Sequence, residues 1–499
     1  MSSSASTSKP RRVVIVGSGI FGISTAQWML GKGGYEVTIV DKSEVIPAPD
    51  AASTDINKIL RNGDYADPDM ATLNIDAIEM WKKPEWKGTF HESGVIVSST
   101  EGHPSCGYVD SSYDNVKQLD PGVRRLEGKG FHSAYPDCLA SSSGSTSSLV
   151  PDRLAHLAQR VTHSRKSHLA DFPRRRGYVN PTSGWGEATR ACEVVLEDIK
   201  RMGCKLVPGK EVTGMTFIEH ESTRGGKRTV NGVKFSDGSE MKADLVVIAA
   251  GAWTPALFAQ PMMGGLPAVV AAGQCVAKIQ LTPEEAEEYK DIPVTLDLTT
   301  GFYCFPPNPD GIMKLAIHAD GYVNTSNPPD PKSTNEGSAQ SSGISAPRTI
   351  LTPGAADGSI PKRQVQILRH ELSKVFPRLA EEKDFVATRL CWYTDTPDSN
   401  WLIDWHPEMD GLLLATAGCG HAFKFLPNIG REILARIEGT LSPEFAHKWR
   451  FEGRAFADRD PSSDADIRGG GAGRKKLVPE ELAERRDLRA DAFTLKAAL

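Results

Sequence analysis

The sequence has 499 residues, of which 39% are hydrophobic and 24% are charged, and its formal net charge is −5. A chain of this length is expected to form two connected domains, and the slight acidic excess excludes the basic surface that attracts nucleic acid or an anionic membrane. No stretch approaches the ~20 consecutive apolar residues of a membrane span, so we expect neither a nucleic-acid nor a membrane partner.

The N-terminal residues follow a strand, helix, strand pattern. Arg11–Val16 is a short run rich in β-branched residues, which predicts a buried parallel strand. The glycine-rich residues 17–22 lead from it into residues 23–30, which have helical character. Tyr35–Val40 then predicts a second strand that closes in Asp41. This order is that of the βαβ unit of dinucleotide-binding domains.

The spacing Gly17-x-Gly19-x-x-Gly22 is the fingerprint of such a unit. Gly17 allows the tight turn, Gly19 lets the backbone approach a pyrophosphate, and Gly22 lets helix and strand pack closely. Asp41 stands near the ~20-residue spacing at which an acid accepts hydrogen bonds from the adenosine ribose. FAD and NAD share this fingerprint, so we expect one of the two. The expected nucleotide contacts also include Ser18, Ile20, Phe21 and Lys42.

Further strands are predicted later in the chain. Residues 243–250 and 411–417 are buried runs stopped by glycines, Gly251 in the first case. Residues 229–235 and 313–318 alternate apolar and polar side chains, as strands of an antiparallel sheet with one covered face do. The sequence thus predicts an α/β fold, in which a discontinuous Rossmann-like domain is joined to a second, antiparallel-sheet domain that holds the substrate.

We divide the chain on this basis. The nucleotide-binding domain is assigned to residues 10–95, 180–260 and 385–450, and the substrate domain to residues 96–179 and 261–384. Residues 141–148 and 323–362 are rich in Ser, Gly, Pro or Asn and predict surface insertions. Residues 455–499 form a charged tail that ends in a helix-like segment, residues 479–499.

Two C-terminal segments match a known family at length. Residues 391–398 read Cys-Trp-Tyr-Thr-Asp-Thr-Pro-Asp and continue through residues 400–407, and residues 418–430 read Gly-Cys-Gly-His-Ala-Phe-Lys-Phe-Leu-Pro-Asn-Ile-Gly. They resemble the flavin-attachment region and the Gly-His-Gly-Phe-Lys segment of the monomeric sarcosine oxidase and fructosyl amino acid oxidase family. Ala422 stands in place of the second glycine. With residues 53–61 and the fingerprint, the resemblance reaches from residue 11 to about residue 450.

The resemblance implies that the cofactor is FAD and that it is covalently attached. Cys391 matches the cysteine that forms a thioether to the flavin 8α-methyl group, a reaction that needs a thiolate near the electron-poor ring. The alternative is a small residue of the buried core. The other expected cofactor contacts in this half of the site are Ser53, Lys58, Gly251, Gly420, His421, Phe423 and Lys424.

Basic residues carry the implied chemistry. Lys314 stands in an apolar strand and matches the family lysine above the flavin, which promotes reaction with oxygen by stabilising superoxide. The alternative is a strand-edge lysine whose ammonium group reaches solvent. Lys58 matches a catalytic basic position near the flavin N5 edge, and Arg61 matches an arginine that can hold a substrate carboxylate. The alternative for these two is a solvated helix face.

His421 and Lys424 follow a strand and precede a helix expected over residues 427–439, whose N-terminus can face the flavin pyrimidine carbonyl. By the resemblance, Lys424 also lies where a substrate carboxylate binds. His421 is either a catalytic group beside the flavin or a hydrogen-bonded structural histidine. Both interpretations stay open from the sequence.

The implied reaction is oxidation of the C–N bond of a secondary amine or N-substituted amino acid, which yields an imine and H2O2. The family's substrates include sarcosine, pipecolate, saccharopine-type conjugates and sugar adducts of amino acids, and a secondary-metabolite amine is a further option. Fructosyl amine oxidases tend to carry an acid where this chain has Phe305, which makes a sugar adduct the less favoured substrate. Residues 302–305 predict an apolar, aromatic wall. A fructosyl amino acid oxidase, an NAD-dependent dehydrogenase and an inactive flavin-binding module remain alternatives.

The remaining expectations concern metals, location and assembly. The eight cysteines have no paired spacing, so neither a disulfide framework nor a metal site is indicated. Residues 1–9 lack the apolar segment of a signal peptide, and the final residues Ala497, Ala498 and Leu499 lack the basic middle residue of peroxisomal signals. We therefore expect a cytoplasmic monomer, with the peroxisome as second option.

Overall fold

The computed structural model describes residues 9–140, 168–218, 227–259, 266, 269–325, 344–453 and 474–492. The insertion expected at residues 141–148 lies outside the described residues, and so do residues 326–343 of the second insertion. In the described part of the chain, no helix combines the length and the apolar character that a membrane span requires.

The first sheet is mostly parallel and has the strand order β20-β22-β13-β1-β2-β9. β1 pairs in parallel with β13 on one side and with β2 on the other, while β20 joins antiparallel to β22. Its strands come from distant parts of the sequence, as expected for a discontinuous nucleotide-binding domain. Their bounds are Arg11–Val16 (β1), Tyr35–Val40 (β2), Lys205–Val207 (β9), Leu245–Ile248 (β13), Leu402–Trp405 (β20) and Leu412–Thr416 (β22).

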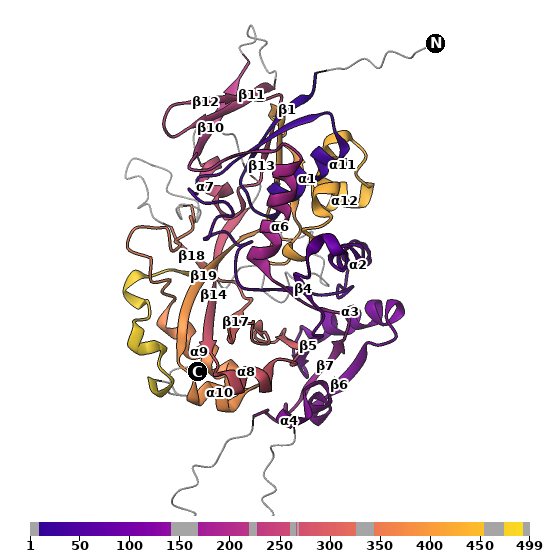
Figure 1. The fold of residues 1–499 in the computed structure, drawn as a ribbon, viewed down its shortest axis with the longest axis vertical. Helices are drawn as coiled ribbons and strands as arrows, with labels where there is room; N and C mark the ends of the chain where they lie inside the picture. The colour runs from indigo at the N-terminus through magenta and orange to yellow at the C-terminus, as the bar shows by residue number, and fades with distance from the viewer. Residues whose placement is uncertain are drawn as a thin grey trace, which may run out of the picture.

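Side chains that alternate along β1 pack into two layers, because successive residues of a strand point to opposite faces. Val13 and Ile15 lie in the core beneath helices α1, α6 and α11, whereas Val14 and Val16 lie in the core beneath a small antiparallel sheet. Both layers flank the first sheet in the upper half of Figure 1. The layers consist of Ile20–Lys32 (α1), Ala188–Arg201 (α6) and Ile429–Glu438 (α11), and of Val212–Phe217 (β10), Arg228–Phe235 (β11) and Glu240–Lys242 (β12).

The second sheet has the order β23-β18-β14-β17-β16-β15-β5-β7-β6, and β19 also pairs with β14. It is largely antiparallel, apart from the parallel pairs of β15 with β5 and of β18 with β23. Its strands are Val95–Thr100 (β5), Arg124–Glu127 (β6), Arg175–Asn180 (β7), Val270–Gln280 (β14), Val294–Asp297 (β15), Phe302–Cys304 (β16), Ile312–Ile317 (β17), Tyr322–Val323 (β18), Phe385–Asp395 (β19) and Lys475–Lys476 (β23).

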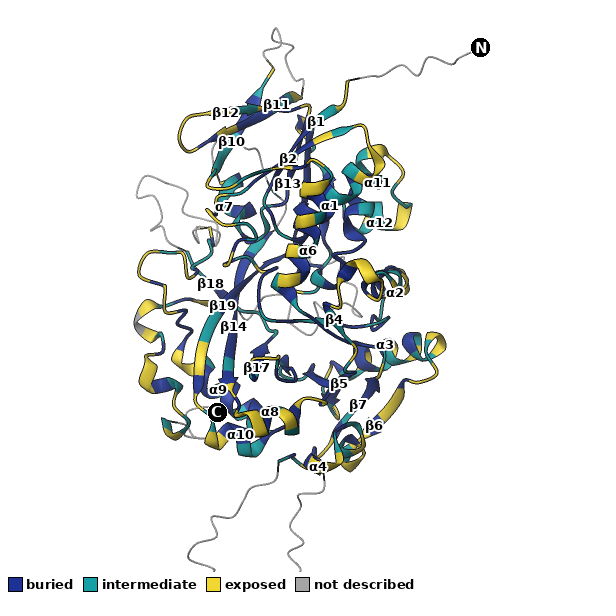
Figure 2. Ribbon diagram, viewed as in Figure 1, coloured by how far each residue is buried: buried dark blue, intermediate teal, exposed yellow. Residues whose placement is uncertain are grey.

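Helices cover both faces of the second sheet. α8, α9 and α10 pack on one face of it, while α3 packs on the other. Figure 2 shows the central strands of both sheets buried, with exposed residues on the outward sides of these helices and on the outer strand β6. The remaining bounds are Lys58–Leu60 (β3), Phe90–His91 (β4), Gly184–Gly186 (β8), Met409–Asp410 (β21), Pro68–Trp81 (α2), Cys106–Leu119 (α3), Asp137–Ala140 (α4), Thr254–Phe258 (α7), Pro283–Tyr289 (α8), Lys362–Ser373 (α9), Pro377–Glu382 (α10) and Pro443–Lys448 (α12).

The structure differs from the expectations drawn from the sequence in three places. Residues 385–395 form β19 of the second sheet, although the division gave 385–450 to the nucleotide-binding domain. Residues 229–235 lie in the small sheet above the first sheet, as the division has them, although their alternating pattern alone suggested the antiparallel sheet of the substrate domain. Within the tail, residues 474–492 dock on the second sheet through β23 and contain 3-10 helices in place of the expected longer helix. In each case a long-range pairing decided what local pattern left undetermined.

Candidate active site

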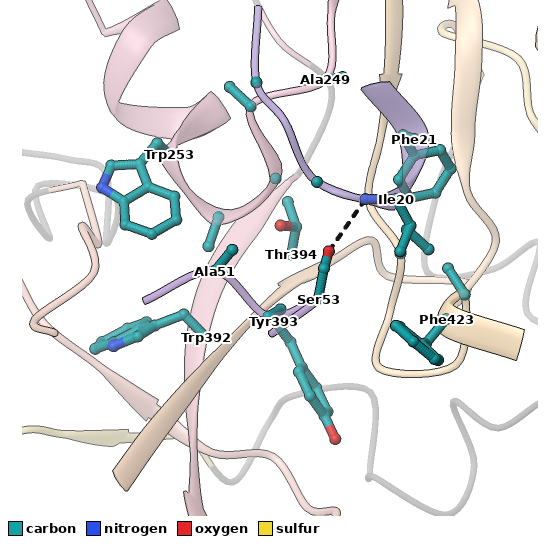
Figure 3. Close-up of a pocket in the computed structure, with 18 of the residues that line it drawn as sticks. Ile20, Phe21, Ala51, Ser53, Ala249, Trp253, Trp392, Tyr393, Thr394 and Phe423 are labelled. Carbon is teal, nitrogen blue, oxygen red and sulfur yellow. Dashed lines mark hydrogen bonds between the residues drawn. The ribbon is translucent and has the colours of Figure 1, made fainter. Parts of the chain in front are cut away.

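One large cavity, of about 410 Å³, lies where the carboxyl ends of the parallel strands meet the second sheet. Its walls come from the turns after β1, β2 and β13, from β16 and β19, and from the segment before α11. Figure 3 shows Ile20, Phe21 and Ala249 on one side of it and Trp392, Tyr393 and Thr394 of β19 on another. Parallel α/β sheets bind ligands at this edge.

The glycine fingerprint has the packing that its spacing predicted. A Cβ on Gly17 would come within 2.4 Å of the Ala249 oxygen, and one on Gly22 within 2.0 Å of the Gly17 oxygen. A Cβ on Gly19 would meet only the Ser53 hydroxyl, at 3.2 Å, and Gly19 lines the cavity. Ser53 also accepts a hydrogen bond from the Ile20 backbone N–H at 3.1 Å (Figure 3). Gly17 and Gly22 therefore serve packing, and Gly19 leaves the start of α1 open to a phosphate.

Asp41 lies at the end of β2 and lines the same cavity. Its carboxylate accepts hydrogen bonds from the backbone N–H and the hydroxyl of Ser18, at 2.8 and 2.6 Å. The Nζ atom of Lys42 lies 4.1 Å from the ring centre of Trp253. Burial lowers the pKa of Lys42, although the charge of Asp50 acts to raise it. These groups form a polar end of the cavity that suits the adenosine part of a dinucleotide.

The thiol of Cys391 lies at the other end of the site. Cys391 is buried on β19 and is not among the residues that line the cavity, but the Nζ atom of Lys58, which does line it, donates to Sγ at 3.7 Å. A cation in this position stabilises negative charge on the sulfur. Lys58 lies on the short strand β3, so the alternative of a solvated helix face is wrong for it.

Lys314 is fully buried on β17. Its Nζ atom lies 2.9 Å from Oδ2 of Asp55, donates to the Asn57 carbonyl at 2.6 Å and lies 5.0 Å from the ring centre of Phe305. Burial lowers the pKa of Lys314 to about 8, although Asp55 acts in the opposite direction. Burial also acts to raise the pKa of Asp55, but Lys314 and Lys58 outweigh it and hold that pKa well below its usual range. The alternative of a solvent-reaching lysine is therefore wrong.

Arg61, His421 and Lys424 meet at the cavity wall. The guanidinium of Arg61 lies 5.1 Å from the ring centre of Tyr65, and Lys424 Nζ donates to the Tyr65 hydroxyl at 2.7 Å and to the His421 carbonyl at 2.9 Å. His421 has both ring nitrogens engaged, Nδ1 with the Tyr65 hydroxyl at 3.1 Å and Nε2 with the Ser399 carbonyl at 3.0 Å. Arg61 and Lys424 are each at most 5% exposed, so the site concentrates positive charge in a water-poor place.

The remaining expected contacts also lie at the cavity. Gly251, Gly420 and Phe423 all line it. Gly420 has a positive φ of 74°, and a Cβ there would come within 2.3 Å of the Tyr393 ring. Only glycine fits at such a position. Of the aromatic wall expected at residues 302–305, Tyr303 and Phe305 line the cavity.

Phe302 and Cys304 pack instead into the core on the opposite face of the second sheet, beneath α9. The two-residue period of a strand separates the two pairs. Only two of the four residues expected in the wall therefore line the cavity, and one of these two, Tyr303, carries a hydroxyl group. Asp55, Tyr65 and Tyr393 are further polar residues of the site that sequence reasoning did not single out.

Asp64 offers a test of the electrostatics around Arg61. Its carboxyl is fully buried and accepts hydrogen bonds from Asn180 at 2.9 Å and Ser183 at 3.2 Å. Burial raises its pKa from 3.8 to about 6, although Arg61 acts to lower it. Between these two pH values the folded state keeps a proton that the unfolded state has lost. The contribution of this carboxyl to stability is therefore complete below pH 3.8 and is lost as the pH rises through 6.

Replacing Asp64 by Asn should remove this dependence on pH. Relative to the wild type, the free energy of unfolding of Asp64→Asn is expected to increase by about 2 kcal/mol between about pH 4.5 and 7.5. Denaturant titrations of both proteins across this range measure the difference, in which the other titrating groups largely cancel. A difference that does not change with pH would contradict the raised pKa of Asp64.

The fold and the cavity together define the class of protein: an oxidoreductase that binds a dinucleotide at the edge of a parallel sheet and closes its reactive end with a second sheet. The comparisons identify the family. The family model described as DAO, FAD dependent oxidoreductase, matches residues 12–436, so the chain belongs to this family. Its cofactor is therefore FAD, not NAD.

Relatives and solved structures support the same assignment. The L-saccharopine oxidase of Schizosaccharomyces pombe is 31% identical over 448 residues, which cover 88% of this chain and 93% of that protein. The amino acid oxidase imqH of Aspergillus flavus is 26% identical, over 89% of this chain and 98% of that protein. The structure of a fructosyl peptide oxidase from E. terrenum has a TM-score of 0.71 and 27% identity, and it covers 95% of this chain and 97% of that one.

FAD fits the residues that are present. Gly19 leaves the N-terminus of α1 accessible to a pyrophosphate, and Asp41 supplies a carboxylate where a ribose is expected. The cations Lys58 and Lys424 line the same cavity. The Ser53 hydroxyl is the group nearest to a Cβ built on Gly19, and it accepts a hydrogen bond from the Ile20 backbone N–H.

Proposed function

We propose that the protein oxidises the C–N bond of a secondary amine or N-substituted amino acid that carries a carboxylate. The substrate is converted to an imine, O2 is reduced to H2O2, and water then hydrolyses the imine to a carbonyl compound and a shorter amine. The observation that carries the proposal is the pair of buried cations, Arg61 and Lys424, at the wall of a cavity that also holds the nucleotide fingerprint.

The side chains of the site have separate tasks in this proposal. Arg61 and Lys424 bind the carboxylate, and Tyr303 and Phe305 cover the reacting carbon and exclude water. The amine must lose its ammonium proton before oxidation, and the cations around it favour the neutral form. FAD, when bound, would supply the acceptor for a hydride (two electrons and one proton) from the substrate, and the two electrons would then reduce O2. Lys314 stabilises the negative charge that develops on O2.

The names of the relatives agree with this chemistry. One is an L-saccharopine oxidase, two are amino acid oxidases and others are sarcosine oxidases. Fructosyl peptide oxidases share the fold, which keeps a sugar adduct as the second candidate. Phe305 speaks against it because an apolar ring stands where those enzymes tend to have an acid. The acids that line the cavity are Asp41, Asp50 and Glu211. They follow β2 or β9 of the first sheet, so none of them stands in the segment that contains Phe305.

A panel of amines with peroxide detection tests the function. We expect H2O2 from one or more of sarcosine, pipecolate, saccharopine and N-methyl amino acids, little from the same amines after the carboxylate is converted to an amide, and little from fructosyl amino acids. Preference for the fructosyl compounds would select the second candidate. Peroxide from none of the amines, with FAD bound, would favour an inactive flavin-binding module.

The carboxylate site is tested by removing its cations. Arg61→Ala and Lys424→Met are each expected to raise KM for a carboxylate substrate by about ten- to a hundredfold, because each loses a charge-assisted hydrogen bond in a buried site. Steady-state kinetics measure the change. Lys42→Met is the matched control, since Lys42 is a cation of the same cavity that lies against Trp253 at the nucleotide end. An equal rise of KM in the control would contradict the assignment.

A covalent bond between Cys391 and FAD is part of the proposal. It is supported by the contact of Lys58 with Sγ and by the placement of Cys391 beside Trp392 and Tyr393. Thioether formation needs the sulfur as a thiolate, and Lys58 is a cation that the structure places beside it.

A further inference from the structure

Tyr65 contacts all three side chains that stand at the carboxylate end of the cavity. It lies in the loop between β3 and α2, is 5% exposed, and is not itself a lining residue. Its hydroxyl is within hydrogen-bond distance of Lys424 and His421, and its ring lies under the guanidinium of Arg61. A residue in this position can act on the substrate only through its neighbours.

The hydrogen bonds around Tyr65 have a fixed direction when His421 is neutral. The Ser399 carbonyl can only accept, so Nε2 of His421 carries the proton and Nδ1 is an acceptor. The single hydroxyl proton of Tyr65 is then donated to Nδ1, and its oxygen accepts from the ammonium of Lys424. The chain of donors runs from Lys424 through Tyr65 and His421 to Ser399, and each bond in it orients the next.

The ring of Tyr65 holds the other cation. Arg61 Cζ lies 5.1 Å from the ring centre, and Lys424 Nζ lies 4.9 Å from it. The ring face places Arg61, whereas Lys424 is placed by the hydroxyl of the same residue. The two cations repel each other, and an anion between them would offset that repulsion. The backbone around Lys424 is anchored separately, because Trp81 Nε1 donates to its carbonyl at 2.7 Å.

We propose that Tyr65 is a positioning residue that couples Arg61, His421 and Lys424 into one preorganised carboxylate site. The proposal rests on the proposed function, since it assigns the element that sets the affinity of that same site. The hydroxyl orients Lys424 through the bond of 2.7 Å, and the ring orients Arg61. Tyr65 itself does not contact the substrate.

Tyr65→Phe separates the two contributions, because it removes the hydroxyl and keeps the ring. With the substrate found in the amine panel, KM is expected to rise about five- to tenfold, because binding loses one charge-assisted hydrogen bond. The value of kcat should change by less than about twofold. Titration of the flavoprotein with acetate, followed by its visible absorbance, should show the same fold loss of affinity. Acetamide should not bind to either protein.

Two controls make the result specific. Tyr113 also lies under an arginine, Arg125, whose Cζ is 4.0 Å from its ring centre, but it is not among the residues that line the cavity. Tyr113→Phe should therefore bind acetate like the wild type. In a Lys424→Met background, Tyr65→Phe should cause little further loss, because the hydroxyl acts through Lys424.

The outcomes distinguish the two proposals. If wild type binds acetate and Tyr65→Phe binds it equally well, Tyr65 is not a positioning residue. A fall of kcat at unchanged KM, or a full loss from Tyr65→Phe in the Lys424→Met background, would also overturn it. If the wild type binds no acetate and oxidises no carboxylate amine, the proposed function fails first. The midpoint of thermal unfolding of each variant shows that the proteins compared are folded.

Discussion

Replacing Lys314 by Met is expected to slow the reaction of the reduced enzyme with O2 by about a hundred- to a thousandfold while changing the rate of reduction by substrate only slightly. The first electron that reaches O2 creates an anion, and a cation in a site without water stabilises it by several kcal/mol. Lys314 has the required burial, because its side chain is 1% exposed. Stopped-flow measurement of the two half-reactions separates the effects.

The neighbouring strand supplies a matched control. Lys278 of β14 lies directly opposite Lys314 in the strand register and pairs with the same carboxylate, at 3.4 Å from Asp55 Oδ1. Lys278→Met removes one cation from Asp55 just as Lys314→Met does, so it reproduces any disturbance of the ion pair. Only Lys314→Met should slow the reaction with O2. Equal slowing of both half-reactions, or an equal effect of Lys278→Met, would contradict the role of Lys314.

The second large effect is expected at Cys391. In the wild type, acid precipitation should leave the yellow colour in the pellet, and the peptide that contains Cys391 should carry the mass of FAD. In Cys391→Ala the colour should move to the supernatant, because no thiol remains to form the thioether. Absorbance of the two fractions and mass spectrometry of the peptide measure the change.

The other buried thiols serve as controls for this result. Cys275 and Cys304 lie in the core of the second sheet, and burial raises the pKa of Cys275 above its usual range and that of Cys304 to about 12. Cys304→Ala should therefore leave the attachment intact. Colour in the supernatant of the wild type would keep FAD as the cofactor and reject the covalent bond.

The sequence predicted the parts of the fold that are encoded locally. The βαβ unit was predictable because Gly17, Gly19 and Gly22 each meet a steric demand that a few neighbouring residues create. Lys314 stood out because a charge in an apolar strand is costly unless something uses it. The structure brings Lys58, Arg61, Phe305, His421 and Lys424 to one cavity, and their chemical roles remain predictions.

What the sequence did not reveal depends on long-range packing. Asp55 becomes the partner of Lys314 only because β14 and β17 bring Lys278 and Lys314 side by side above it. Tyr65 is 359 residues away from Lys424, with which it shares a hydrogen bond, and no local pattern links them. Lys58 lies in a strand of three residues, Lys58–Leu60, which is too short to show a period and is fixed by its pairing with β8.

The order of the strands in the first sheet has a consequence for biosynthesis. β13 lies between β1 and β22, so its two parallel neighbours stand near opposite ends of the chain. A ribosome that adds about 5–20 residues per second releases β1 roughly 20 to 80 s before β22. The cavity wall likewise runs from Val16 to Lys424. The flavin pocket is therefore completed only after residue 424 has been synthesised, and no short contiguous fragment of the chain contains all of it.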